Sequence, residues 1–230
     1  MSCILHIETS TSLCSVALSQ DGVCLYEEAD EHGLTAARQL ASFADMALSF
    51  ADSHAIPVDA VAVSKGPGSY TGLRIGVSLA KGVAYARRIK LIGIPTLKVL
   101  TVPMLLREEG MDENAWLCPM IDARRMEVYC ALYDRALREK HPTRALVVDE
   151  YSFADILSER AVYFLGNGAD KCAGVIRHPN AKFISRVVPK AKSMIPLAEM
   201  AMAREEFEDV AYFEPFYLKD FVATTPKTLL

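Results

Sequence analysis

The sequence repeats one order of strand-like and helix-like segments, and this repeat constrains the fold more than any other feature. Short apolar or alternating runs indicate strands, whereas apolar residues at intervals of three or four indicate helices. In the first half, the expected strands are 3–8, 13–19, 23–28, 59–64 and 90–94, and the expected helices are 34–53, 71–88 and 95–107. In the second half, the expected strands are 116–122, 126–134, 144–148 and 161–166, and the expected helices are 152–160 and 193–207. The second half therefore follows the order β-β-β-α-β-α, with which the first half also begins.

The two halves also begin alike, with ILHIETSTSLCSVAL in the first and LCPMIDARRMEVYCAL in the second. Each is an apolar strand that ends in an acid, followed by a turn and a second strand. A duplicated unit of this kind resembles the actin, hexokinase and Hsp70 type of α/β fold, in which nucleotide normally lies between two subdomains. We expect one actin-like subdomain over residues 1–108 and another over 109–230, whose last helix and tail pack back on the first.

Composition and charge exclude several classes of protein. The 230 residues are 51% hydrophobic and carry a net charge of −4, so the chain as a whole has no general attraction to nucleic acid or to membranes. No apolar stretch reaches the roughly 20 residues that span a bilayer, and the N-terminus lacks the basic region of a secretory signal. We therefore expect a cytoplasmic protein without a membrane contact.

Cysteine and histidine show no pattern typical of metal binding. The six cysteines include no Cys-x-x-Cys pair and are expected to be buried free thiols. The five histidines never occur three or four residues apart, so neither a protein-only metal site nor a cofactor is expected.

The stretch GPGSYTGLRIG, residues 66–76, is the most unusual local feature. A glycine-rich turn that opens a helix can bind phosphate, but this one matches neither the Walker pattern nor the dinucleotide pattern. In the following helix, Gly72, Gly76, Ala80 and Ala84 recur every four residues and form a ridge almost without side chains. The preceding helix is also rich in alanine. Such faces favour close helix packing, against a partner or against the chain's own sheet, and both alternatives are open.

Two acids could support a rival function as an autonomous small-molecule kinase or ATPase. Kinases of this fold hold Mg-nucleotide with an Asp at the end of the first strand, where this chain has Glu8, and the following TSTS supplies no glycine for a phosphate turn. The longer side chain would displace the carboxylate by roughly 1.5 Å, a misplacement of the size that costs activity. Asp122 precedes Arg124 and Arg125 in IDARR; it could belong to a polar site, or only organise the turn with one arginine paired to it.

Several longer motifs together resemble the TsaB (YeaZ) family. They are ILHIETSTSLCSVAL, EHGLTAARQL, SKGPGSYTGLRIGVSLAKGVAYA, IPTL, IDARRMEVYCALY and EPFYLK, spread from residue 4 to residue 219. The resemblance implies a non-catalytic scaffold, the dimerization subunit of the bacterial complex that makes threonylcarbamoyladenosine next to the tRNA anticodon. It also implies a heterodimer with the catalytic subunit TsaD, a further ATPase partner TsaE, contact with tRNA through the complex, and a homodimer when the chain is alone.

By the same resemblance, the first subdomain would bind the partner through the small-residue faces of 34–53 and 66–84. The expected interface residues are Leu34, Ala37, Ala41, Ala44, Leu48, Gly66, Pro67, Gly68, Ser69, Tyr70, Thr71, Gly72, Leu73, Arg74, Gly76, Ala80 and Ala84. An arginine in place of Gly76 is expected to abolish the heterodimer without unfolding the chain. TsaD holds its metal with a His-x-x-x-His motif, whereas here His32 is followed by Ala36, so the second ligand is missing. The sequence assigns no single role to the aromatic residues of PFYLKDF, which could cover the junction with the partner or only close the core.

Overall fold

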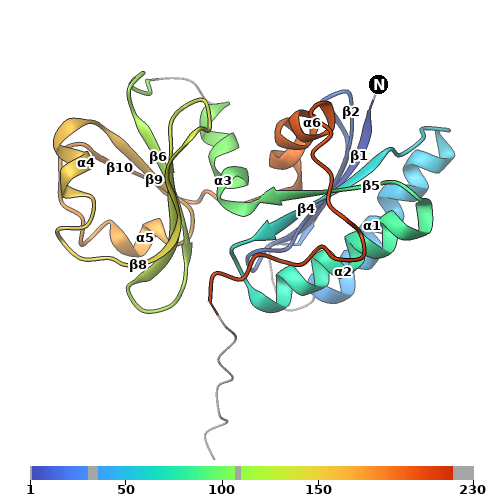
Figure 1. Ribbon diagram of the computed structural model, residues 1–230, viewed down its shortest axis with the longest axis horizontal. Helices are drawn as coiled ribbons and strands as arrows, with labels where there is room; N and C mark the ends of the chain where they lie inside the picture. Colours follow the sequence, from blue (N-terminus) through green and yellow to red (C-terminus); the bar gives the residue numbers. More distant parts are fainter. Residues whose placement is uncertain (1, 31–35, 107–109, 220–230) are drawn as a thin grey trace, which may run out of the picture.

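The computed structural model describes residues 2–30, 36–106 and 110–219, without the side chains of residues 36–38. It consists of two lobes, each built around one five-stranded sheet. Helix α3 (Thr96–Leu105) stands between the two sheets (Figure 1).

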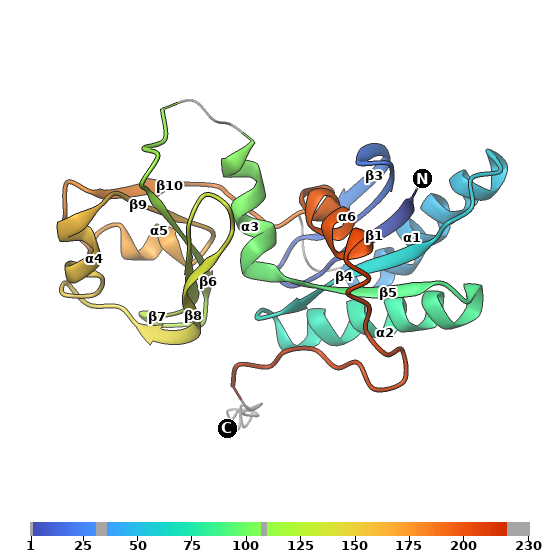
Figure 2. The same ribbon diagram turned by 45° about the horizontal axis from the view of Figure 1, so that its top comes forward.

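The first lobe is a mixed sheet with helices on both faces. Its strands are β1 (Cys3–Glu8), β2 (Cys14–Gln20), β3 (Val23–Asp30), β4 (Ala60–Gly66) and β5 (Lys90–Pro95), in the order β3-β2-β1-β4-β5. β1 pairs antiparallel with β2 and parallel with β4, and β4 pairs parallel with β5. β1 is buried throughout its length and β4 at nearly every residue, which explains their almost continuous apolar sequences. Helices α1 (Ala36–Ser53) and α2 (Tyr70–Arg87) cover one face, and α6 (Ile195–Ala203) covers the other (Figure 2).

The second lobe has the same strand topology. Its strands are β6 (Trp116–Asp122), β7 (Glu127–Tyr133), β8 (Glu139–Val147), β9 (Val162–Leu165) and β10 (Ala181–Ile184), in the order β10-β9-β6-β7-β8. Its helices are the short α4 (Ala154–Glu159) and α5 (Ala169–Cys172), and a 3₁₀ turn, η1 (Ala191–Met194), leads into α6. Because β6 pairs antiparallel with β7 and parallel with β9, each strand of this sheet has a counterpart in the first.

The duplicated α/β fold predicted from the sequence is confirmed, and the duplication is more complete than predicted. α5 and β10 were missed because each has only four residues, too few for a periodic pattern. The predicted strand 144–148 overlaps the end of a longer strand, β8, which begins at Glu139. The start of β8 was not predicted, because its first residues, EKHPT, are too polar to indicate a strand.

Helices α3 and α6 connect the lobes. α3 packs Leu97 and Leu100 against the second sheet, and Val99 and Val102 against the first. α6, although it follows the second sheet in the chain, packs Leu197, Ala198 and Ala201 on the first sheet. The expected boundary at residue 108 lies outside the described residues.

Five of the six cysteines are buried free thiols, as predicted, and Cys24 is half-buried. Burial raises the pKa of Cys3 and of Cys14 to about 11, so both remain protonated at neutral pH. Within the described ranges, none of the helices has the length and apolar character needed to cross a bilayer.

Candidate partner-binding surface

Helices α1 and α2 lie side by side on one face of the first sheet. Ser69 caps α2 by accepting a hydrogen bond from the Gly72 N–H at 3.2 Å. Near their C-terminal ends the two helices are joined by Arg87, whose guanidinium donates to both carboxylate oxygens of Asp52 at 2.8 and 2.6 Å. This bidentate pair fixes how the two helices are aligned.

The glycines of residues 66–76 allow α2 to pack directly on the loop between β1 and β2. A Cβ atom on Gly68 would overlap the Ser10 carbonyl oxygen, and one on Gly72 would overlap the carbonyl oxygen of Thr9. The contact is held by two hydrogen bonds, from Ser69 N to Ser10 O at 2.7 Å and from Thr9 Oγ1 to Gly72 O at 2.8 Å. In this chain, the glycine-rich stretch is therefore a site of close backbone packing, and its start is occupied by protein atoms where a phosphate would have to lie.

The predicted ridge faces the interior of the first lobe. Gly76 packs against the Thr9 side chain, and Ala80 and Ala84 are at most 1% exposed. The other interface positions that are buried are Ala44, Leu48, Gly66, Pro67 and Leu73. The prediction that these positions face outward toward a partner is wrong, because they pack inside the first lobe. A helix on a sheet turns its smallest residues toward the sheet when the two approach closely.

The remaining predicted interface residues are distributed differently. Ala41, Ser69, Thr71 and Arg74 are exposed, whereas Gly68, Tyr70 and Gly72 are half-buried. Leu34 lies outside the described residues, as does the side chain of Ala37, and His32 is not described either.

A second set of small and apolar residues forms the outward side of the two helices. On α2 these are Ile75, Ser78, Leu79, Gly82 and Ala86, all exposed or half-buried. On α1 the corresponding residues are Ala41, Ser42 and Met46, and Met46 is 40% exposed. Apart from Ala41, this set was not predicted from the sequence, although residues 75, 78, 79, 82 and 86 show the three-and-four spacing of one helix face.

Glu8, the candidate acid at the end of β1, is enclosed. Its carboxylate accepts hydrogen bonds from Ser10 N at 2.6 Å and from the Ser64 hydroxyl, and the residue is fully buried. Burial raises the pKa of Glu8 above its ordinary value, against hydrogen bonds from Ser10, Ser64 and Thr9 that lower it. The contact of Thr9 and Ser10 with α2 lies directly beside this acid.

Asp122, the second candidate acid, organises the turn between β6 and β7, which is one of the two roles predicted for it. It accepts a hydrogen bond from the Arg124 N–H at 2.7 Å. Its cationic partner is Lys171, at 2.6 Å, and not an arginine of IDARR. Burial acts to raise the pKa of Asp122, but the hydrogen bonds from Lys171 and Arg124 outweigh it and lower the pKa.

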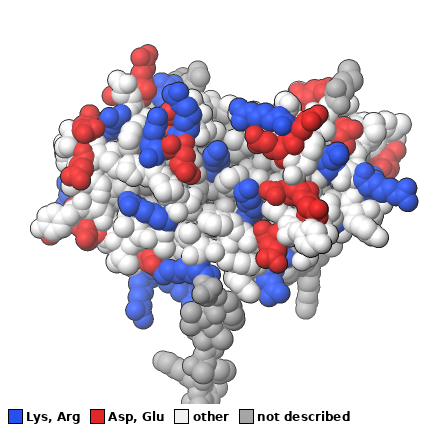
Figure 3. Space-filling model, in the orientation of Figure 1, with Lys and Arg blue, Asp and Glu red and all other residues white. Residues whose placement is uncertain are grey.

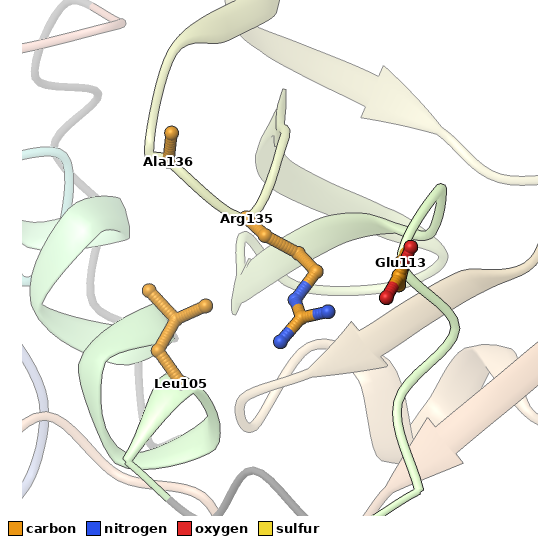
Figure 4. Close-up of a pocket in the computed structure, with 4 residues that line it drawn as sticks. All are labelled: Leu105, Glu113, Arg135 and Ala136. Carbon is orange, nitrogen blue, oxygen red and sulfur yellow. The ribbon is translucent and has the colours of Figure 1, made fainter.

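Two of the hollows that the described residues form open on the surface, and neither is lined by Glu8 or Asp122. The larger, of about 460 Å³, lies at the C-terminal end of α3, and Arg135 points into it between Leu105 and Glu113 (Figure 4). The smaller, of about 290 Å³, lies between β5, α3 and α6. Neither candidate acid of the rival function therefore lines either hollow.

The C-terminal segment 208–219 runs along the flank of α2 (Figures 1 and 2). Lys81 of α2 donates hydrogen bonds to the carbonyl oxygens of Ala211 and Phe213, at 3.1 and 2.9 Å. The Phe216 N–H donates to the Lys65 carbonyl at 2.6 Å. These contacts give EPFYLK a structural role, since they attach the tail to the first lobe.

Comparison with known proteins agrees with the sequence motifs. Residues 27–227 match the family model described as "TsaD: tRNA N6-adenosine threonylcarbamoyltransferase". The chain is 30% identical to the Escherichia coli "tRNA threonylcarbamoyladenosine biosynthesis protein TsaB", over 96% of each chain. The solved structure of YeaZ from Pseudomonas aeruginosa has a TM-score of 0.79 and 26% identity, covering 95% of this chain and all of that one.

More distant similarity concerns the fold alone. An inorganic polyphosphate/ATP-glucomannokinase from Arthrobacter has a TM-score of 0.51 at 9% identity, and the match covers 89% of this chain. This supports the hexokinase-type architecture and carries no information on activity. On the motifs, the fold and the match to relatives over nearly the whole length, the chain belongs to the family that the TsaD model describes and, within it, to the TsaB (YeaZ) group.

Proposed function

We propose that this protein is a non-catalytic subunit of the machinery that makes threonylcarbamoyladenosine in tRNA. In this proposal it binds a catalytic TsaD subunit through the outward side of α1 and α2, with TsaE as a further partner and tRNA bound by the assembled complex. The observation that carries the proposal is the packing of α2 on Thr9 and Ser10, which encloses Glu8 and turns a second small-residue face outward.

The outward side of α1 and α2 has the properties of a helix-packing surface. Gly82 is exposed in the middle of a helix and has no other atom within 4 Å of the position of a Cβ. A glycine there costs the helix about 1 kcal/mol relative to alanine. Half-buried Leu79 and Ile75 lie one and two turns before it in the helix, so a partner helix could approach closely at Gly82 and contact these apolar side chains.

The enclosure of Glu8 argues against the rival function as an autonomous kinase or ATPase. A catalytic carboxylate must reach bound metal or water, whereas both oxygens of Glu8 accept hydrogen bonds from the chain itself. Asp122 is likewise engaged, by Lys171 and by the backbone of its turn. We assign no catalytic residue to this chain.

The test is light scattering after gel filtration, on the chain alone and mixed with TsaD from the same organism. Arginine at Gly76 is unsuitable, because Thr9 already occupies the space that any side chain there would need. Gly82→Arg places the same bulk on the outward side, in open space. Gly174→Arg is the matched control, since Gly174 is also exposed with nothing within 4 Å.

We expect a one-to-one species with TsaD for the wild-type chain and for Gly174→Arg, and none for Gly82→Arg. A homodimer of the chain alone, if it uses the same surface, should be lost with Gly82→Arg as well. Normal complex formation by Gly82→Arg would place the partner elsewhere. Absence of any complex with the wild-type chain, even with TsaE and nucleotide present, would reject the proposed function.

A further inference from the structure

The proposed function leaves two features without a role: the end of the described tail and the turn between β6 and β7. They lie together at the base of the molecule, where Figure 3 shows a group of Lys and Arg side chains. We infer that this basic and aromatic surface binds the phosphates and unpaired bases of an RNA. The inference rests on the proposed function, which supplies tRNA as the RNA that the complex would bind.

Aromatic rings form the side of this surface that adjoins α2. The rings of Tyr70 and Tyr217 lie 4.6 Å apart between centroids, and the Arg74 guanidinium lies 5.4 Å from the centre of the Tyr70 ring. Two residues further along the tail, Lys219 donates to both carboxylate oxygens of Glu127, at 2.5 and 2.6 Å. The tail therefore joins the flank of α2 to the first residue of β7, and the surface is continuous between the two lobes.

Cations dominate the other side, because its two acids are already paired. Lys219 binds Glu127, and Lys171 binds Asp122 at 2.6 Å and also donates to two backbone carbonyls of the turn. Arg124 and Arg125 are exposed, and neither forms an ion pair within the described part of the chain. The turn thus carries two uncompensated positive charges on a protein whose net charge is −4.

Both arginines of the turn also have a backbone conformation that is unfavourable for their residue type. Arg124 and Arg125 have φ angles of +73° and +49°, the left-handed region that asparagine and glycine adopt with less strain. Two consecutive arginines there lower the stability of the isolated chain. The guanidinium groups have a use if they bind something outside the chain.

Nucleic acid is the partner that this combination of groups fits best. Exposed guanidinium groups bind phosphate oxygens in pairs of hydrogen bonds. Tyrosine rings and arginine planes are the platforms on which unpaired RNA bases stack. The uncompensated charges of Arg124 and Arg125 favour nucleic acid over a protein partner, because charged residues are depleted at the centre of protein interfaces.

The experiment measures binding of an unmodified tRNA transcript to the complex of this chain with TsaD, by fluorescence anisotropy at several salt concentrations. The variant is Arg124→Asn combined with Arg125→Gly, which removes both charges and supplies residues that suit the left-handed backbone, so it is expected to fold. The control is Arg88→Gly. Arg88 is also exposed, with a φ of +56°, but it lies at the opposite end of α2, roughly 27 Å from Tyr70.

If both arginines contact phosphates, the loss follows from counterion release. Each contact contributes a slope of about 0.7 to 0.9 in log K against log salt, or roughly 5- to 8-fold at 0.1 M salt. We expect the double variant to bind tRNA about 25- to 60-fold more weakly, with a salt slope smaller by about 1.4 to 1.8. Arg88→Gly should bind like the wild type, and co-elution of both variants with TsaD should be unchanged.

The other outcomes are decisive as well. Unchanged tRNA affinity of an intact complex would overturn the inference, and so would loss of the TsaD complex in the double variant, because the turn would then be a protein contact. If the wild-type chain forms no complex with TsaD, the proposed function fails separately. The same variants would then be measured on the chain alone, where a matching loss of tRNA affinity would support the inference and no loss would reject it.

Discussion

The same substitution at two glycines of α2 should have opposite effects on stability. Gly72 and Gly82 lie ten residues apart in one helix, but their surroundings differ completely. A Cβ on Gly72 would overlap the main-chain carbonyl oxygen of Thr9, whereas a Cβ on Gly82 would have no atom within 4 Å. We expect Gly72→Ala to destabilise the chain and Gly82→Ala to stabilise it.

The magnitudes follow from separate contributions. Gly82→Ala should gain about 1 kcal/mol, the difference in helix propensity between the two residues. Gly72→Ala forces α2 away from Thr9, at an overpacking cost of about 1 to 3 kcal/mol. It should also weaken the hydrogen bond from Thr9 Oγ1 to Gly72 O, which measures 2.8 Å and contributes about 1 kcal/mol. Gly72 also lies in α2, so Gly72→Ala gains the same helix propensity and that gain cancels. The two variants should therefore differ by about 2 to 4 kcal/mol.

Urea unfolding followed by circular dichroism measures this difference. With a slope of about 3 kcal/mol per molar urea, the two midpoints should be separated by roughly 0.7 to 1.3 M. A Gly72→Ala protein as stable as Gly82→Ala would refute the reasoning. It would mean that α2 and the loop after β1 can separate at little cost, and that Glu8 is not held in an enclosed site.

Two further predictions concern buried ionisable groups on β1. Burial raises the pKa of Glu8, so ionisation of this buried carboxyl lowers the stability of the folded chain as the pH rises above the ordinary pKa of a glutamate. Glu8→Gln should therefore increase the free energy of unfolding at pH 8 and leave TsaD binding intact. Loss of TsaD binding in this variant would indicate a functional carboxylate. Burial lowers the pKa of His6 from 6.5 to about 3, so the unfolded chain takes up a proton below pH 6.5 that the folded chain takes up only near pH 3. The contribution of His6 to stability should fall by roughly 2 kcal/mol between pH 8 and pH 5, while that of Glu8 rises over the same range. Urea unfolding of His6→Gln should therefore show a change in stability between these pH values that is about 2 kcal/mol more favourable than in the wild type; an equal change in the two proteins would contradict the assignment.

The fold could be predicted from the sequence because its main elements are long and strongly patterned. The run CILHIE is continuous and apolar because β1 lies at the centre of its sheet, between β2 and β4. The helices of 18 residues, α1 and α2, show clear periodicity. α5 and β10 could not be predicted, since four-residue elements are fixed by the sheet they join and not by a local pattern.

The site was harder to predict, because spacing identifies a face of a helix without saying what it faces. The ridge of Gly72, Gly76, Ala80 and Ala84 was recognised correctly as a close-packing surface, but its partner is Thr9 and the first sheet. Only the three-dimensional position of the loop after β1 decides between an internal contact and an external one. The pairing of Asp122 with Lys171 was equally inaccessible, because 49 residues separate the two in the chain.

The internal contact of α2 also explains the outward one. Once Gly72 and Gly76 are fixed against Thr9, the rotation of the helix is set, and Ile75, Leu79 and Gly82 must lie on its other sides. Gly82 then lowers the stability of the isolated chain, and nothing outside its own helix contacts the position of its Cβ. A glycine at such a place is useful when another backbone comes close. The same packing that fills the start of the glycine-rich stretch with protein atoms thus fixes the orientation of the surface on which we place the partner.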